Sequence, residues 1–403
     1  MKERPPRVAY FPDAYLELDG VARTSQEFED FARRRDLPFL LVHGGPKNAT
    51  STSGSVTRVQ LRRSRIGFSV DHAHDYDWIF FRWLRKATQL VRDFRPDVLQ
   101  ITGPSDVGMM GALIAHNLGI PLAATWQTNL SQYARIRVAA LTSFLPQPLT
   151  SAFSQAVEKI GLRGFLRFYK IPQLLFAPNS EIIEMLRKTT GKPCFLMDHA
   201  ADTEAFNPRF RTRNGGSFRI GFVGRLSAEK NVAVLARLEQ ALLAAGHNDF
   251  QIVVIGQGKQ ERWLRDNLRQ AEFTGSLSGL ELAEAFANLD VLAFPSETET
   301  FGLVVLEALA SGVPAVVTAK GGPKFIVRHG RSGYVAQTFE EFVSYTAALM
   351  TQPDLLAKMR IAARRQTLTT NWDGIFEGMY ETYQRYLLSP SSADQPVLSV
   401  ATN

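Results

Sequence analysis

Two glutamates, Glu299 and Glu307, stand eight positions apart where a predicted strand turns into a predicted helix. The apolar run 291–295 predicts the strand, and 301–310 predicts the helix. Eight residues cover about two helical turns, so one carboxylate can meet a ligand at the helix start while the other reaches a more distant hydroxyl. Charged hydrogen bonds of this kind contribute roughly 1.5–3 kcal/mol. An acidic surface is the alternative, but Glu307 lies within an apolar helix, where a glutamate without a partner is costly.

The start of the same helix predicts an anion site. The first N–H groups of a helix have no acceptor within the helix, and here they would belong to Phe301, Gly302 and Leu303. Gly302 lets a ligand approach the backbone closely. The helix dipole adds up to about 2 kcal/mol in a partly buried geometry.

Two cations, Arg225 and Lys230, follow the strand predicted over 218–223. Their segment, Gly-Arg-Leu-Ser-Ala-Glu-Lys-Asn from 224 to 231, has neither the spacing of a Walker loop nor that of a dinucleotide fingerprint. Cations beside a tight turn suit a diphosphate leaving group, on which negative charge grows as a bond breaks. Two solvated surface cations remain an equally open interpretation.

Other conspicuous residues are interpreted structurally. The His and Asp side chains of 72–77 look like a metal cluster, but no confirming ligand motif accompanies them, so we expect a polar loop. The single cysteine, Cys194, excludes a disulfide framework and a cysteine-rich zinc module. We expect Cys194 to behave as a small apolar residue, and Trp126 and Trp372 to pack.

Alternating strand and helix patterns supply the elements that hold these residues. Strands separated by helices predict parallel βαβ units. The chain is therefore predicted to be an α/β protein of two doubly wound, Rossmann-like units, and ligands of such units bind beyond the carboxyl ends of the strands. Strands are expected at 7–11, 39–42, 97–101, 120–125, 218–223, 250–255, 272–274, 291–295 and 314–318. The segment 49–65 is expected to be a loop or a hairpin.

Domain boundaries follow from this alternation. We expect an N-terminal domain at 1–178, with the linker near Pro178, and a C-terminal domain at 179–370. A last helix should occupy 371–388, and the Ser/Pro-rich residues 389–403 should form a disordered tail.

Composition and charge narrow the class of protein. The 403 residues are 45% hydrophobic and 21% charged, as in globular proteins. No apolar run reaches the roughly 18 residues of a membrane span, and the start of the chain is too short for a signal peptide, so we expect a cytoplasmic protein. Residues 1–180 carry 23 basic and 15 acidic residues, whereas 181–403 carry 23 and 24. This basic N-terminal half predicts either an anionic partner or a solvated basic surface.

Over residues 7–388 these segments resemble the nucleotide-sugar glycosyltransferases of family 4, which have the GT-B fold. Glu299 and Glu307 match the E-x7-E motif of that family, and the segment 224–230 matches its G-R-L-x-x-E-K motif. The remaining matching segments are Gly256-x-Gly258, Phe273-Thr274-Gly275, Gly321-Gly322-Pro323 and Asp202-Thr203-Glu204-x-Phe206-x-Pro208. The resemblance implies two facing domains with a cleft between them, and a last helix that crosses back onto the N-terminal domain.

The resemblance also implies roles for individual residues. Arg225 and Lys230 would bind the donor diphosphate, and Glu307 the ribose hydroxyls. Glu299 and the amides of Phe301, Gly302 and Leu303 would hold the donor sugar and phosphate. The base would lie near Thr274 and Gly275, and Gly20, within Asp19-Gly20-Val21, would belong to a glycine loop that closes on the phosphates. Such enzymes retain the anomeric configuration by attack on the face from which the leaving group departs, and need no metal or other cofactor.

One position departs from the family pattern. Gln127 stands in Thr125-Trp126-Gln127-Thr128-Asn129, where the family usually has a histidine. Glutamine can donate and accept hydrogen bonds but cannot titrate. Gln127 can therefore replace a histidine that acts by hydrogen bonding, but not one that exchanges a proton.

The resemblance predicts transfer of a hexose, of mannose or glucose type, from a nucleotide-diphosphate sugar to a hydroxyl acceptor. A lipid or polyol acceptor, anionic or membrane-linked, would explain the basic half better than nucleic acid does. In that case 58–65 and 135–170 should bind anionic vesicles, and the enzyme should associate peripherally with the inner face of the membrane. A nucleotide-sugar binding protein with weak or no activity is the alternative that Gln127 raises, and a GT-B-like epimerase is another. The base (UDP-, GDP- or ADP-linked), the acceptor and the oligomeric state stay open.

Overall fold

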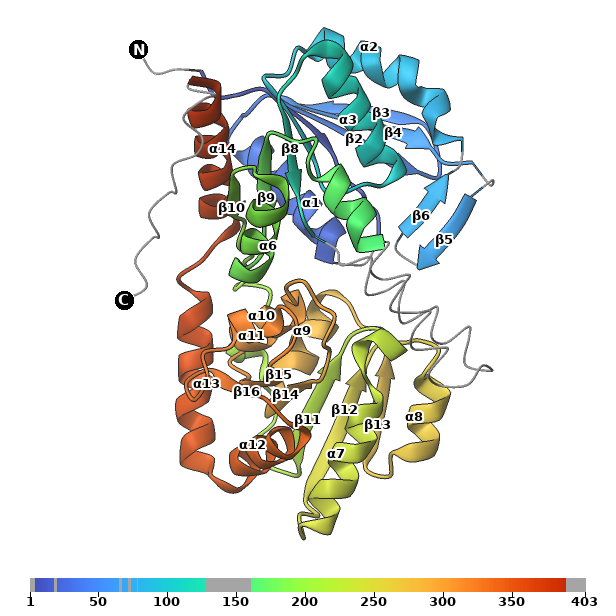
Figure 1. Cartoon of the computed structure of the whole chain (residues 1–403). Coiled ribbons are helices and arrows are strands. Elements are labelled where there is room, and N and C mark those ends of the chain that lie inside the picture. The colour runs from blue at the N-terminus through green and yellow to red at the C-terminus, as the bar shows by residue number, and fades with distance from the viewer. Residues whose placement is uncertain are drawn as a thin grey trace. The chain divides into compact units, whose positions relative to one another are not determined.

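The computed structural model describes residues 4–17, 20–64, 67–71, 74–77, 79–127 and 161–388. The chain forms two compact α/β units (Figure 1). The first contains the described residues up to His199 together with Trp372–Leu388, and the second contains Ala200–Asn371. Residues 389–403, where the sequence predicts a tail, lie outside the described part.

The first unit is built on an eight-stranded sheet in the order β10-β9-β8-β7-β1-β2-β4-β3. All neighbouring strands are parallel except β3 and β4, which form an antiparallel hairpin. The strands are β1 (Val8–Phe11), β2 (Phe39–Gly45), β3 (Ala49–Ser53), β4 (Val56–Arg62), β7 (Val98–Ile101), β8 (Leu122–Thr125), β9 (Leu174–Ala177) and β10 (Cys194–Leu196). A separate two-stranded sheet pairs β5 (Gly67–Asp71) with β6 (His74–Asp77).

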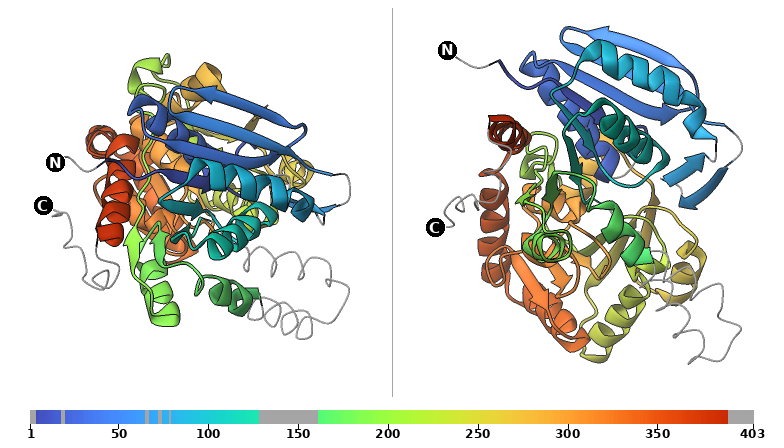
Figure 2. Two further views of the ribbon diagram at one scale, coloured as in Figure 1. Left: turned by 90° about the horizontal axis from the view of Figure 1, so that it is seen from above. Right: turned by 45° about the horizontal axis from the view of Figure 1, so that its top comes forward.

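Helices cover both faces of the first sheet. The helices are α1 (Gly20–Arg34), the 3-10 turn η1 (Phe80–Trp83), α2 (Leu84–Phe94), α3 (Asp106–Leu118), α6 (Ser180–Thr190) and α14 (Trp372–Leu388). Helices α2 and α3 contact each other, as do α1 and α14 (Figures 1 and 2). The last helix therefore packs on the first unit, where the ring of Phe376 stacks on that of Phe28 at 4.5 Å.

The second unit is built on a six-stranded, wholly parallel sheet in the order β13-β12-β11-β14-β15-β16. The strands are β11 (Phe218–Val223), β12 (Phe250–Ile255), β13 (Ala271–Gly275), β14 (Val291–Phe294), β15 (Ala315–Thr318) and β16 (Gly333–Ala336). β11 and β14 are buried along most of their length, as expected of central parallel strands with helices on both faces.

The helices of the second unit alternate with its strands. They are η2 (Pro208–Phe210), η3 (Ala228–Lys230), α7 (Ala233–Ala244), α8 (Glu261–Asn267), α9 (Gly279–Ala287), α10 (Leu303–Ala310), α11 (Pro323–Ile326), α12 (Phe339–Thr351) and α13 (Pro353–Thr367). α7 contacts α12, whereas α10 contacts α9, α11 and α13. Each unit has its own apolar core.

The first unit ends later than Pro178, where the sequence pattern places the linker. Leu174–Ala177 forms β9, and the chain continues through α6 into β10 of the same sheet. Pro178 therefore lies in a tight βα connection, and Asn179 caps α6 by accepting a hydrogen bond from the Ile182 N–H at 3.0 Å. The chain leaves the first unit after His199.

Candidate active site

The second sheet reverses its strand order between β11 and β14. From β11 the chain proceeds outward through β12 and β13, and then returns to place β14 on the other side of β11. The loops that follow β11 and β14 diverge from such a point and leave a crevice where ligands of open α/β sheets bind. These two loops carry Arg225, Lys230 and Glu299, so the topology brings the predicted residues to one edge.

Lys230 and Glu299 form an ion pair at this edge. The Lys230 Nζ donates to the Glu299 Oε1. The two side chains are only 12% and 16% exposed, so solvent screens this pair less than an ordinary surface pair. Arg225, on the same loop, is half-buried. The structure thus pairs a residue predicted to bind phosphate with a residue predicted to bind sugar, and the two are 69 positions apart in the sequence.

Side chain-to-backbone hydrogen bonds hold the two loops together. The Thr298 hydroxyl donates to the Glu229 carbonyl oxygen at 3.0 Å, and the Asn231 amide donates to the Pro295 carbonyl oxygen at 3.3 Å. Thr298 is buried. These bonds fix the turn that presents Lys230 relative to the turn that presents Glu299.

The loop after β15 closes the site from a third direction. The Gly322 N–H donates to the Glu299 carbonyl oxygen at 2.7 Å. A Cβ at Gly322 would lie 2.2 Å from the Thr300 carbonyl oxygen, so only glycine allows the two backbones to come this close. Gly302, at the N-cap of α10, has φ +105° and lies against Pro323. This explains why glycines stand at 302 and 322.

Helix α10 presents one partly exposed face at its start. Leu303, Val304 and Glu307 are half-buried, whereas Val305, Leu306 and 308–310 are buried. Residues three and four apart lie on the same side of a helix, so Glu307 lies on the same face as Leu303, about 6 Å farther along the axis. The arrangement fits a ligand with an anion at the helix start and hydroxyls farther along.

The loops after β11, β12 and β13 also touch one another. The Gly224 N–H donates to the Ile255 carbonyl oxygen at 3.0 Å, and the Gly256 N–H donates to the Gly275 carbonyl oxygen at 2.8 Å. The Thr274 hydroxyl donates to the Gly275 carbonyl oxygen at 3.1 Å. The predicted base-binding residues Thr274 and Gly275 thus lie at the same carboxyl edge, two strands from the Lys230 loop.

The two predicted residues of the first unit lie at the corresponding edge of its sheet. That sheet reverses its strand order between β1 and β7, and the Asp13 N–H of the loop after β1 donates to the Thr102 hydroxyl after β7 at 2.7 Å. Gly20 is the exposed first residue of α1, and Gln127 is buried just beyond β8. Asp19, Thr128 and Asn129 lie outside the described residues.

The residues that the sequence analysis expected to have structural roles lie in packed positions. Cys194, Trp126 and Trp372 are buried, and burial raises the pKa of the Cys194 thiol to about 12. The Asp77 carboxylate accepts hydrogen bonds from Ser64, Ile79 and Arg82. Burial opposes ionisation of Asp77, but these bonds outweigh it and lower its pKa to about 2. Among the described residues, no group of three or more His, Cys, Asp or Glu side chains is arranged to hold a metal, and His72 lies outside them.

Sequence reasoning missed how the site is positioned: it named Asn231 and Gly322 only as members of matching segments and gave Thr298 no role. Thr298, Asn231 and Gly322 act through backbone atoms of other loops, and their partners are far away in sequence. For Thr298 the only sequence signal was its position between two glutamates, in a loop that already carried the E-x7-E motif.

Known proteins resemble this chain in sequence. Residues 204–366 match the family model described as glycosyl transferases group 1. The chain is 30% identical over 308 residues to a GDP-mannose-dependent alpha-mannosyltransferase of Mycolicibacterium smegmatis, covering 74% of this chain and 76% of that protein. A protein of the same name from Corynebacterium glutamicum is 28% identical over 74% of this chain and 70% of its own length.

Solved structures show the same fold at low sequence identity. Sucrose-phosphate synthase from Thermosynechococcus elongatus matches 96% of this chain and all of its own, with a TM-score of 0.72 at 15% identity. WaaG, a glycosyltransferase involved in lipopolysaccharide biosynthesis, matches 93% of this chain and 98% of its own, with a TM-score of 0.62 at 16% identity.

Proposed function

The chain belongs to the group 1 glycosyl transferases, family 4 of the GT-B fold, and from this premise we propose that it transfers mannose from GDP-mannose to a hydroxyl acceptor with retention of configuration. The observation that carries the proposal is the Lys230–Glu299 pair at the strand-order reversal, beside the start of α10. The choice of mannose over glucose, and of guanine over uracil or adenine, is supported by the names of relatives that match most of the chain.

Donor binding would exchange the partners of this pair. The diphosphate attracts Lys230 and Arg225 and approaches the amides at the start of α10. Glu299 then loses its lysine partner and can accept hydrogen bonds from sugar hydroxyls. Glu307, farther along the exposed face of α10, would accept from the ribose hydroxyls, and the base would lie near Thr274 and Gly275.

The transfer step replaces one bond to the sugar C1 by another. The bond between C1 and the diphosphate oxygen breaks with its electron pair going to the diphosphate, and the acceptor oxygen bonds to C1 on the same face. The acceptor proton passes to the departing diphosphate. Lys230 and Arg225 stabilise the charge that grows on the leaving group, so neither a metal nor a titrating side chain at Gln127 is required by this route.

For the acceptor we propose an anionic or lipid-linked hydroxyl compound, bound by a protein that touches the membrane surface. Exposed Ile79 and Phe81 lie beside the basic start of α2, where Arg85 and Lys86 are exposed. Apolar side chains with flanking cations suit the interface of an anionic bilayer. Among the described helices, none combines the length and the apolarity needed to cross a bilayer. The proposed contact is peripheral, at the cytoplasmic side.

The test is release of nucleoside diphosphate from GDP-mannose, UDP-glucose and ADP-glucose, with and without lipid and polyol acceptors. We expect acceptor-dependent release of GDP that falls about 10²–10³-fold in Lys230→Ala and Glu299→Gln. Lys320→Ala is the matched control, because Lys320 also pairs with a glutamate of this loop, Glu297, at 3.1 Å but is 72% exposed. Unchanged release in the Lys230 and Glu299 variants would refute the assignment of the site.

The same assay separates the alternatives. A GT-B-like epimerase would convert the donor without an acceptor and without net release of nucleoside diphosphate, and a binding protein would bind GDP-mannose but release nothing. The Glu299–Glu307 arrangement together with Arg225 and Lys230 favours the transferase over the epimerase.

A further inference from the structure

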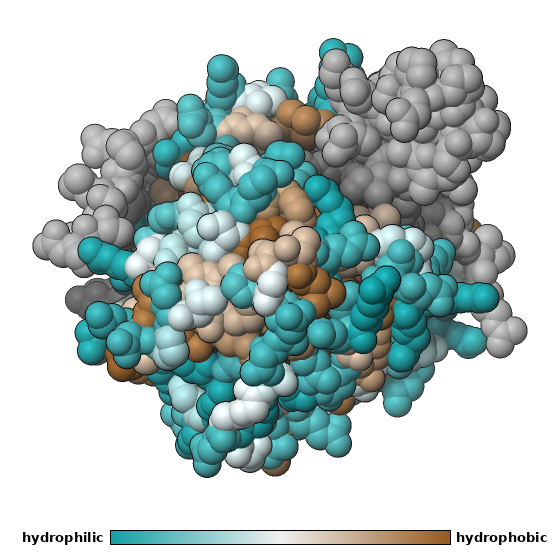
Figure 3. Space-filling view, turned by 90° about the horizontal axis from the view of Figure 1, so that it is seen from below, coloured by the Kyte–Doolittle hydropathy of each residue, from teal (hydrophilic) through white to brown (hydrophobic). Residues whose placement is uncertain are grey.

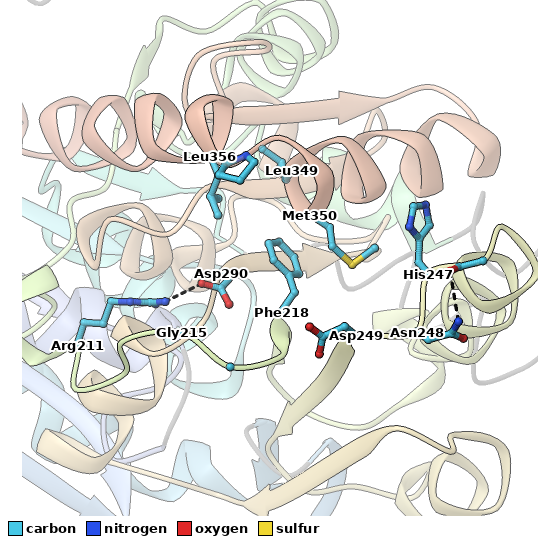
Figure 4. Close-up of a pocket in the computed structure, with 13 residues that line it drawn as sticks. Arg211, Gly215, Phe218, His247, Asn248, Asp249, Asp290, Leu349, Met350 and Leu356 are labelled. Atoms are coloured by element: carbon cyan, nitrogen blue, oxygen red, sulfur yellow. Dashed lines mark hydrogen bonds and ion pairs between the residues drawn. The ribbon is translucent and has the colours of Figure 1, made fainter.

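A cavity lies at the edge of the second sheet opposite to the candidate active site. It has a volume of about 580 Å³ and is lined by residues that precede or begin β11, β12 and β14, and by the turn between α12 and α13 (Figure 4). Strands of six residues rise about 20 Å, so this cavity is separated from the Lys230–Glu299 pair by the length of the sheet. None of the predicted donor residues lines it.

An aromatic ring and two carboxylates dominate the lining. Figure 4 shows Phe218 in the middle of the cavity, with Asp290 on one side and Asp249 on the other. Met350 and Leu356 add an apolar wall from α12 and α13. Figure 3 views the side on which the lower ends of α7 and α12 lie, and there apolar residues gather near the centre with hydrophilic residues around them.

The two carboxylates of this lining differ in how they are engaged. The Asp249 carboxylate, which is exposed, makes no hydrogen bond or ion pair with other residues of the described chain. The Asp290 carboxylate is engaged within the protein, because it accepts from Arg211 at 2.7 Å, from Arg360 at 3.2 Å and from the Arg219 N–H at 2.9 Å. Arg211 also donates to the carbonyl oxygens of Ala287 and Leu289 at 3.0 and 2.9 Å. Because Arg211 is the only arginine or lysine of the lining and is already committed to these three acceptors, the cavity disfavours an anion such as a second nucleotide.

We propose that this cavity binds uncharged pyranose rings, as a carbohydrate subsite separate from the donor site. One face of a pyranose carries C–H groups, which pack on the negative face of an aromatic ring such as Phe218. Its hydroxyls need acceptors, which the exposed Asp249 carboxylate supplies. The volume lies within the roughly 300–1,000 Å³ of small-molecule sites.

The subsite gives a hexosyltransferase a second site at which it binds sugar. It binds sugar units that an acceptor already carries, or those of a glycosylated product, while the carboxyl edge of the same sheet holds the donor. The inference does not depend on which nucleotide sugar is used, because its evidence lies at the other end of the strands.

The experiment measures binding of methyl α-mannopyranoside and α-linked mannobiose by saturation-transfer difference NMR, with saturating GDP and UDP present to occupy the donor site. We expect millimolar binding that weakens about tenfold or more in Asp249→Asn and in Phe218→Leu, which keeps apolar bulk but removes the flat ring. Asp354→Asn is the matched control, because Asp354 is an exposed carboxylate in the first turn of α13 that does not line the cavity. Thermal melting of each variant checks that it folds.

Three outcomes would overturn the proposal. The first is absence of sugar binding to the wild-type protein at tens of millimolar. The second is equal binding by wild type, Asp249→Asn and folded Phe218→Leu. The third is binding of a polyamine such as spermidine without binding of sugar, which would assign the two carboxylates to a cation instead. Donor turnover by Asp249→Asn should equal that of wild type, so failure here is distinguishable from failure of the proposed transferase.

Discussion

Lys230 and Glu299 form an ion pair with each other, and under the proposed function this pair sets the cost of donor binding. Both side chains are largely buried, and a buried charge that loses its partner is costly. A donor that supplies both a diphosphate for Lys230 and hydroxyls for Glu299 leaves neither charge uncompensated. A free diphosphate supplies only the first of these, so the pair favours the complete nucleotide sugar.

Thr298 is predicted to position this pair without touching the donor. Its hydroxyl fixes the Glu229 carbonyl oxygen at 3.0 Å, one residue before Lys230. Thr298→Val removes this bond and leaves a buried carbonyl with one fewer donor, at a cost of about 1–3 kcal/mol. We expect KM for the donor to rise by about tenfold with a smaller fall in kcat, and Thr298→Ser, which keeps the hydroxyl, to restore KM.

The readout that distinguishes positioning from stability is this split between KM and kcat. If Thr298→Val lowered the melting temperature but left KM unchanged in the folded fraction, Thr298 would be a structural residue only. Thr346→Val is the control, because Thr346 is also buried and bonds a backbone carbonyl, that of Phe342 at 2.8 Å, within α12.

The buried His43 should make the free energy of unfolding depend on pH. It is buried in β2, its ring lies 4.5 Å from that of Tyr15, and burial lowers its pKa from 6.5 to about 4. The unfolded chain therefore binds a proton between these values that the folded chain does not. Stability is lost as pH falls from 6.5 toward 4, by roughly 3 kcal/mol at most from this residue.

Thermal melting of His43→Phe between pH 7.5 and 4.5 tests this dependence. Phenylalanine keeps a ring beside Tyr15 but cannot titrate, so the melting temperature should fall less steeply with acid than in wild type. His116→Gln, an exposed change in α3, should leave the slope as it is. Parallel slopes for His43→Phe and wild type would contradict the prediction.

Single residues show where sequence information stops. Glu299, Glu307, Arg225 and Lys230 could be identified because their motif spacing is local. The pairing of Lys230 with Glu299 could not be predicted, because the two residues are 69 positions apart and meet only through the reversal of strand order. Arg58 belongs to the segment 58–65 that is predicted to bind anionic vesicles, and its pairing with the buried Glu29 at 2.7 Å could not be predicted either.

Loops after neighbouring strands form the site because glycines let their backbones touch. A Cβ at Gly322 would lie 2.2 Å from the Thr300 carbonyl oxygen, and one at Gly258 would lie 2.2 Å from that of Leu226. We expect Gly322→Ala and Gly258→Ala to push the loops apart and to reduce donor turnover at least tenfold, because misplacement by about 1 Å can cost 10²-fold.

The control for these substitutions is Gly378→Ala in α14. A Cβ there meets nothing within 4 Å, and alanine favours a helix by roughly 0.5–1 kcal/mol over glycine. Gly378→Ala should therefore keep full turnover with equal or higher melting temperature. Full turnover in Gly322→Ala would show that the close approach is not needed for the site.

Strands and helices were predictable where the hydrophobic pattern was long or was clearly bounded by glycine, proline or polar residues. The ranges 218–223 and 250–255 coincide with β11 and β12, and the hairpin interpretation of 49–65 describes β3 and β4. β9 was not predicted, because four buried apolar residues next to Pro178 carry no periodicity. Its place in the sheet comes from pairing with β8 and β10, which is tertiary information.

For the whole molecule, the uneven distribution of charge matters most for the acceptor. The basic excess lies in residues 1–180, but part of it is neutralised within the first unit. Arg63 pairs with the buried Asp106 at 2.6 Å and is 15% exposed, so together with Arg58 it weakens the case for 58–65 as the membrane-binding segment. The exposed cations of α2 are better placed to meet an anionic surface, and residues 135–160 lie outside the described chain.

Vesicle binding tests whether the exposed cations of α2 form the membrane-binding surface. We expect the protein to co-sediment with vesicles of anionic phospholipid but weakly with neutral ones, and to dissociate as salt shortens the Debye length from about 10 Å at 0.1 M. Replacing Arg85, Lys86 and Arg92 of α2 with glutamine should weaken binding by up to about 1 kcal/mol per charge. The matched control replaces three exposed cations of the second unit with glutamine, so that both variants lose the same net charge. These cations are Arg262, Arg331 and Lys358. If both triple variants lose binding alike, net charge alone drives it, and if neither does, the acceptor is reached without the α2 surface.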